Sequence, residues 1–222
     1  STYAARMVNT EFCSSPLSTA WLVPQWPAIA GVQAVFSTRH GGVSQAPWNS
    51  LNLGGHVGDA CAAVARNRAI LESSLSASAT HAVKLQFLEQ VHGWQVQHLP
   101  CAQTLPQADA SITDLPGYAC TVMVADCLPV LIAHRRWGVI GAAHAGWRGL
   151  VGHAGRGVLE ALWDAYAHLV RQHEAHIGHT ALVADTQVWL GPCIGATAFE
   201  VGEDVYRAFT DNDVQAKHGF AP

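Results

Sequence analysis

Charged side chains are scarce in this sequence. Aspartate, glutamate, lysine and arginine make up 13% of the 222 residues, whereas 50% are hydrophobic. Soluble domains usually carry about 25% charged residues, so we expect much of the chain to lie in a core or at a partner surface. Lysine is nearly absent, with only Lys84 and Lys217, and the formal net charge is −4. Because no basic run is present to neutralise phosphates, nucleic acid is not expected as a partner.

No stretch of the sequence is apolar for long enough to suggest a membrane span. The longest apolar stretch, residues 122–133, is interrupted by Asp126 and Pro129, and a spanning helix needs about 20 apolar residues. Residues 1–12 contain no apolar signal core. The six cysteines are scattered without any C-x-x-C pair, which does not indicate a small disulfide scaffold. We therefore expect mostly buried free thiols, a cytoplasmic protein and no membrane partner.

The hydrophobic pattern predicts one domain over residues 1–222, because no flexible linker or fixed-period repeat divides the sequence. Strands are predicted over residues 32–37, 83–88, 94–99, 120–125, 128–133, 138–143 and 188–190. Helices are predicted over residues 59–76, 150–173 and 203–209, with Asp59 as the cap of the first. Residues 38–58 form a long polar loop, which is often a functional feature. Strands outnumber helices and several are joined by short turns, which favours an α+β fold with mixed or antiparallel sheets.

Three short strings place a metal-ligating side chain beside a turn. They are Q-V-H-G (90–93), A-D-C-L-P-V (125–130) and A-H-A-G-W-R-G (143–149), and their ligands are His92, Cys127 and His144. Two imidazoles and one thiolate suit zinc with a fourth position left open, as in a catalytic site. The same side chains could instead act without metal, with Cys127 as a nucleophile and histidine as its base. Asp126 could orient a neighbouring imidazole. Taken alone, Cys127 is more typical of a small buried thiol than of a functional residue.

Other polar residues are candidates for substrate contacts. Arg148 lies in a glycine-rich turn at the predicted start of the longest helix, where its guanidinium and the helix N–H groups could bind phosphate or a carboxylate. Arg39 and His40 lie in the polar loop, which could form a wall of a substrate cleft. The remaining cluster of histidines, at positions 168, 173, 176 and 179, lies near a helix C-terminus, where imidazolium is favourable without metal.

Seven strings together resemble the YfiH-like family, also described as multicopper polyphenol oxidase or laccase-domain proteins and as purine nucleoside phosphorylases. In chain order the strings are T-R-H-G-G-V-S (38–44), S-L-N-L-G-G-H-V-G-D (50–59) with Asn67-Arg68, Q-V-H-G, A-D-A-S-I-T (108–113), A-D-C-L-P-V, A-H-A-G-W-R-G and G-P-C-I-G-A-T-A-F-E-V-G (191–202). They are spread over most of the length of residues 32–209, and their order makes the resemblance specific.

The resemblance implies a fold of layered sheets with flanking helices, shared with cysteine-dependent deamidase toxins. It maps the family's metal triad onto His92, Cys127 and His144, with zinc as the expected ion and copper as the alternative. It implies phosphorolysis of adenosine, inosine and methylthioadenosine, with adenosine deamination, so that purine nucleoside and phosphate are the expected small-molecule partners. Arg39, His40 and Arg148 are then the expected substrate or phosphate contacts.

Members of the family usually continue well beyond the segment that matches residues 199–202, so we expect the C-terminal end of this chain to be truncated. Two other enzymes stay open as alternatives. One is a copper-dependent polyphenol oxidase, although true laccase chemistry needs about ten histidine ligands, largely in H-x-H pairs, and the 13 histidines here form no such pair. The other is a Cys–His amidase that edits a peptidoglycan precursor. A non-enzymatic metal-binding module is the third alternative.

Overall fold

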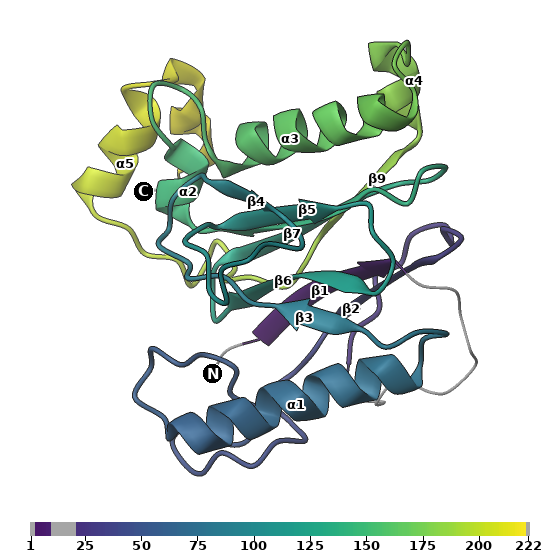
Figure 1. The fold of residues 1–222 in the computed structure, drawn as a ribbon. Helices are drawn as coiled ribbons and strands as arrows, with labels where there is room; N and C mark the ends of the chain where they lie inside the picture. The colour runs from purple at the N-terminus through teal and green to yellow at the C-terminus, as the bar shows by residue number, and fades with distance from the viewer. Residues whose placement is uncertain (1–2, 10–20, 221–222) are drawn as a thin grey trace.

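The computed structural model describes residues 3–9 and 21–220. Two mixed sheets lie face to face, with α1 covering the outer face of one and α3 the outer face of the other (Figure 1). The first sheet has the order β2-β1-β6-β3 and consists of β1 (Tyr3–Asn9), β2 (Val32–Phe36), β3 (Lys84–Gln86) and β6 (Tyr118–Val124). The second has the order β4-β5-β8-β7-β9 and consists of β4 (Val96–His98), β5 (Ala110–Thr113), β7 (Leu128–His134), β8 (Ile140–Ala145) and β9 (Thr186–Leu190). The predicted layered α+β fold is therefore confirmed.

The helices pack outside these sheets or connect their strands. They are α1 (Cys61–Ala77), α2 (Trp147–Val151), α3 (Val158–His173), α4 (His179–Ala184), α5 (Glu203–Thr210) and a 3₁₀ helix, η1 (Val214–Gly219). No helix within the described ranges is long and apolar enough to cross a membrane.

Apolar side chains form one buried cluster in each interface between layers. Val122 and Leu131 belong to the cluster between the two sheets, to which both sheets contribute. Leu162 and Tyr166 of α3 pack on the second sheet. Leu71 of α1 packs under the first sheet. This layering follows from strands that are buried on both faces and from the apolar stripe on each long helix.

The predicted helix over residues 150–173 is wrong at its start, because a turn separates α2 from α3. Gly152 and Gly155 have φ values of +62° and +76°, and Ala154 has a φ of +51°. These left-handed conformations interrupt a helix and favour glycine. The backbone N–H groups of His153 and Arg156 each donate to the other's carbonyl oxygen at 3.1 Å. The apolar spacing continues through this turn, which is why periodicity alone missed the break.

The start of α1 also differs from the prediction, since Ala60 and not Asp59 is its N-cap. The Asp59 carboxylate accepts hydrogen bonds from Ser44 Oγ at 2.6 Å, Asn52 Nδ2 at 2.9 Å and the Ala60 N–H at 2.7 Å. The buried side chain of Asn67 on α1 in turn donates to Ser44 Oγ at 2.8 Å. These hydrogen bonds therefore hold the loop of residues 38–58 against α1.

Most predicted strands agree with the structure to within two residues at each end. The elements that sequence patterns did not predict are β1, β5, α4 and η1. Strand β5 has only four residues, all buried, and such a short run gives little periodic signal. Cysteines 61, 101, 120, 127 and 193 are free thiols, but the expectation that most of them are buried is wrong, because of these five only Cys120 is buried. Cys13 lies outside the described residues.

Candidate metal centre

The structure brings His92, Cys127 and His144 together from three separate segments. His92 lies in the turn between β3 and β4, Cys127 between β6 and β7, and His144 near the end of β8. Their candidate ligand atoms all lie within 4.8 Å of one another. The two imidazole rings meet edge to face, with centroids 4.7 Å apart and planes at 80°. Within residues 3–9 and 21–220, this is the one group of three histidine, cysteine or acidic side chains close enough to share a metal ion.

The carboxylate beside His144 belongs to Asp109, whereas the sequence analysis had assigned the orienting role to Asp126. Asp109 is fully buried, and its Oδ1 lies 2.8 Å from His144 Nδ1. Burial alone would raise the pKa of Asp109, but hydrogen bonds from His144 and from the backbone N–H groups of Gly93 and Val91 outweigh it, so that the net pKa is lowered. Asp109 is therefore an ionised hydrogen-bond acceptor near neutral pH.

The environments of the two other side chains of the triad shift their pKa values in opposite directions. Burial and the neighbouring His144 lower the pKa of His92, which keeps its imidazole neutral and able to bind a cation. Burial, together with the charge of Asp126 and a hydrogen bond with it, raises the pKa of the Cys127 thiol to about 11. Without a cation, Cys127 is therefore a protonated thiol at neutral pH. A bound divalent cation reverses this preference, because the ligand that it favours is the thiolate.

Gly146 provides the space between two members of the triad. A Cβ atom at this position would lie 2.9 Å from His92 Cδ2 and 3.1 Å from Cys127 Sγ. Gly146→Ala is therefore expected to push the two ligands apart and to weaken zinc binding by about tenfold or more. Competition with a chelator measures this affinity. Gly178→Ala is the matched control, since a Cβ there meets nothing within 4 Å, and equal affinity in the two variants would contradict the expected crowding.

Arg148 lies in α2, which has only five residues and is separate from the longer α3. The prediction that Arg148 lies at the start of the longest helix is therefore wrong. The Arg148 side chain is exposed and its guanidinium lies 4.3 Å from the centroid of the Trp147 ring. Arg148 follows His144 by four residues, across the turn at Gly146. The guanidinium itself is thus the feature that could meet an anion near the triad.

Arg39 and His40 lie in the loop between β2 and α1. Arg39 donates from Nε at 2.8 Å and from Nη2 at 2.6 Å to the carbonyl oxygen of Asn49, so it holds the two sides of its own loop together. His40 is exposed. Their predicted contact with substrate stays a prediction.

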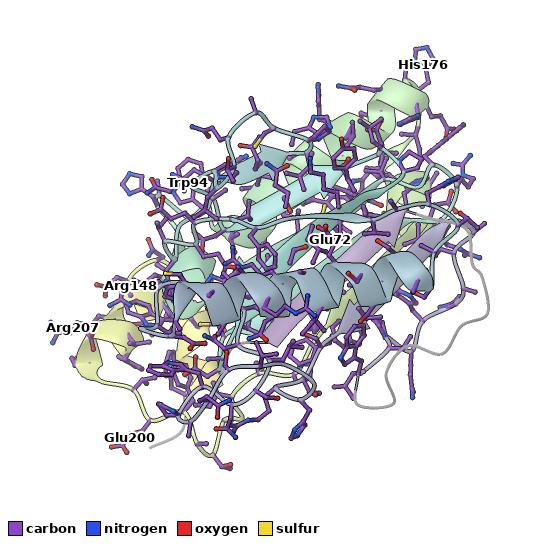
Figure 2. The ribbon with its side chains drawn as sticks, turned by 60° about the horizontal axis from the view of Figure 1, so that its bottom comes forward. Glu72, Trp94, Arg148, His176, Glu200 and Arg207 are labelled. Atoms are coloured by element: carbon purple, nitrogen blue, oxygen red, sulfur yellow. The ribbon has the colours of Figure 1, made fainter. Side chains whose placement is uncertain are left out.

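His173, one of the histidines near the end of α3, contacts an aspartate and a tryptophan. His173 Nε2 lies 2.9 Å from the Asp114 carboxylate, and its ring stacks on Trp137. Figure 2 shows His176 at the opposite end of the view from Arg148. These histidines are thus available as controls that leave the triad untouched.

Residues 33–222 match the family model described as multi-copper polyphenol oxidoreductase laccase. The chain belongs to this laccase-like family. Among its relatives, a purine nucleoside phosphorylase of Pseudomonas aeruginosa is 45% identical over 203 residues, covering 91% of this chain and 74% of the relative. The purine nucleoside phosphorylase YfiH of Escherichia coli is 44% identical over 202 residues, covering 90% of this chain and 74% of the relative.

Solved structures of the laccase-like family share the fold. A Neisseria meningitidis protein superposes with a TM-score of 0.76 and 39% sequence identity, covering 92% of this chain and 75% of that one. YlmD from Geobacillus stearothermophilus has a TM-score of 0.65 and 30% identity, covering 90% of this chain and 71% of its own. The resemblance found in the seven sequence strings is therefore confirmed.

Proposed function

We propose that this protein is a cytoplasmic, metal-dependent purine nucleoside phosphorylase that acts on adenosine, inosine and methylthioadenosine and also deaminates adenosine. The observation that carries the proposal is the convergence of His92, Cys127 and His144 in a chain whose relatives are named purine nucleoside phosphorylases. Phosphate and a purine nucleoside are then its small-molecule partners.

The side chains of the triad fit zinc, with copper as the alternative ion. Zinc binds nitrogen at about 2.0–2.1 Å and thiolate sulfur at about 2.3 Å, and three protein ligands with one open position are typical of a catalytic zinc site. The ligand atoms lie within 4.8 Å of one another, which is close enough for them to share one ion. When bound, such an ion supplies a Lewis acid and lowers the pKa of water in its open position. His92, Cys127 and His144 are the residues proposed to hold it.

The protein's own residues account for the placement of substrate. The exposed guanidinium of Arg148 offers planar, paired donors for phosphate oxygens, and its stacking on Trp147 limits the directions in which they can point. Arg39 and His40 are proposed to contact substrate from the loop between β2 and α1. Buried His144 stays oriented by Asp109 while substrate binds.

Arg148→Ala is expected to raise the KM for phosphate by about tenfold or more, since a charged hydrogen bond contributes about 1.5–3 kcal/mol, while the zinc content stays unchanged. Steady-state rates at varied phosphate concentration measure this effect. Arg66→Ala, which removes an exposed arginine from α1, is the matched control. An unchanged phosphate KM in Arg148→Ala would mean that Arg148 does not bind phosphate.

The test of the proposed function is product analysis with purified protein. Inosine with phosphate should give hypoxanthine and ribose 1-phosphate, and adenosine should give inosine without any need for phosphate. Cys127→Ala and His144→Ala should lose both reactions, whereas Cys61→Ala and His176→Ala, which change exposed residues, should retain them. Absence of nucleoside turnover in zinc-loaded protein would reject the proposal.

The alternative chemistries have weaker support from the site. Four-electron reduction of oxygen requires several coupled copper ions, and within the described ranges one His₂Cys group is present. A Cys–His amidase needs a reactive thiolate, and the environment of Cys127 raises the pKa of its thiol to about 11. A phosphorylase that uses Cys127 as a metal ligand avoids both difficulties.

A further inference from the structure

We propose that Asp109 is a positioning residue that prepares both histidines of the triad for metal binding. The inference rests on the proposed metal site and extends it to a residue that touches neither the ion nor the substrate. Asp109 lies immediately before β5, and its carboxylate accepts hydrogen bonds from both histidine-bearing segments, namely the turn that carries His92 and the ring of His144.

The contact with His144 selects the tautomer that can bind metal. An ionised carboxylate can only accept, so His144 must donate from Nδ1 to Asp109 Oδ1 across the 2.8 Å that separates them. The lone pair of the neutral ring is then on Nε2, the nitrogen left for a metal ion. The backbone N–H of His144 also donates to the backbone carbonyl of Asp109 at 2.7 Å. Both contacts fix the ring between strands β5 and β8.

The contact with His92 supports an unfavourable backbone conformation. His92 has a φ of +58°, and such left-handed conformations cost free energy in residues other than glycine unless their surroundings hold them. The Asp109 carboxylate accepts from the N–H groups of Val91 at 3.1 Å, His92 at 3.0 Å and Gly93 at 2.7 Å. One side chain thus receives three consecutive N–H groups of the turn, and this directs the His92 side chain toward Cys127 and His144.

The donors are divided evenly between the two carboxylate oxygens, which makes the charge of Asp109 difficult to replace. Oδ1 accepts from the His92 N–H and from His144 Nδ1, and Oδ2 accepts from the N–H groups of Val91 and Gly93. An asparagine must place its NH₂ group at one of these positions. In one orientation the NH₂ group faces the N–H groups of Val91 and Gly93, so that donors face donors. In the other orientation the NH₂ group faces the His92 N–H and His144 Nδ1. It then favours the tautomer of His144 in which Nδ1 accepts a hydrogen bond and Nε2 carries the proton.

Asp109→Asn is therefore expected to weaken zinc binding by about 10- to 100-fold, the usual effect of losing such a partner of a metal ligand. The matched control is Asp114→Asn. Asp114 immediately follows β5 and also hydrogen-bonds an imidazole, that of His173 at 2.9 Å, but that imidazole is outside the triad. The control is expected to change zinc affinity by less than about twofold. Affinity is measured by chelator competition, with circular dichroism to verify the fold of both variants.

A second measurement uses the metal-free wild-type protein and does not depend on folding of the Asp109→Asn variant. Nitrogen-15 shifts of the His144 ring, assigned by comparison with His144→Gln, report which nitrogen carries the proton. The wild-type protein should show the Nδ1–H tautomer, and a folded Asp109→Asn variant should show a mixture or the Nε2–H tautomer.

Two results would overturn the inference. One is a predominantly Nε2–H tautomer of His144 in the wild type, and the other is wild-type zinc affinity in a folded Asp109→Asn variant. If instead the phosphorylase proposal is wrong, the protein should bind zinc with the expected dependence on Asp109 but turn over no nucleoside.

Discussion

Cys127→Ala is expected to reduce bound zinc from about one ion per chain to a small fraction of that, and to abolish nucleoside turnover at the same time. The substitution removes the one sulfur ligand and leaves two imidazoles, whereas three protein ligands are the usual minimum of a catalytic zinc site. The affinity for zinc should fall by about 100-fold or more, which exceeds the effect of losing a residue that only hydrogen-bonds a metal ligand. Elemental analysis after dialysis against a weak chelator measures the loss.

The control for this substitution is Cys61→Ala, which removes an exposed thiol from the first turn of α1. It should retain both zinc and turnover. If Cys127→Ala retained stoichiometric zinc, Cys127 would not be a ligand, and the assignment of the metal centre would be wrong. Loss of activity with full retention of zinc would instead point to Cys127 as a nucleophile.

The affinity of the protein for zinc is expected to rise by about tenfold for each pH unit between pH 6.5 and 8.5. Burial and Asp126 raise the pKa of the Cys127 thiol to about 11, so that zinc must displace one proton from sulfur over this whole range. His92 contributes little to the dependence, because burial lowers its pKa below the ordinary value of 6.5. As pH rises, fewer protons compete with zinc for the Cys127 sulfur, so the affinity for zinc increases.

Chelator competition at several pH values gives the slope, and calorimetry in buffers of different ionisation enthalpy counts the protons released. The expected count is close to one proton per zinc ion at neutral pH. An affinity that did not change between pH 7 and 8.5 would show that the thiol is already ionised without metal. That result would favour a nucleophilic Cys127 over a ligand that is deprotonated by the ion.

Local patterns in the sequence predicted much of the fold. Strand β7 (Leu128–His134) lies at the predicted position because its residues are nearly all apolar and buried, and a short continuous apolar run predicts a buried strand. The break between α2 and α3 was missed, because left-handed backbone at Gly152 and Gly155 interrupts the helix without interrupting its apolar spacing. Strand β1 pairs with β2 and β6, partners that no local pattern in residues 3–9 specifies.

Sequence patterns likewise predicted only part of the candidate site. His92, Cys127 and His144 could be found because their ligand types and glycine-containing turns are visible in short strings of sequence. Asp109 could not be assigned its partners, since they are 16 to 35 residues distant along the chain and meet only when β5 pairs with β8. The string A-D-A-S-I-T, which places Asp109 among small and apolar residues, was the available signal, because a buried carboxylate needs hydrogen-bond donors. Asp126, which is adjacent to Cys127, was the more obvious choice from sequence and acts on the thiol instead.

Reconstitution of metal-free protein tests the central claim most directly. The protein is stripped of metal, zinc is added back in steps, and ribose 1-phosphate formed from inosine and phosphate is measured in the same samples as bound zinc. The proposed function predicts that turnover rises in proportion to bound zinc, saturates at about one ion per chain and requires phosphate. A preparation that holds one zinc per chain and forms no ribose 1-phosphate from any of the three proposed nucleosides would contradict it.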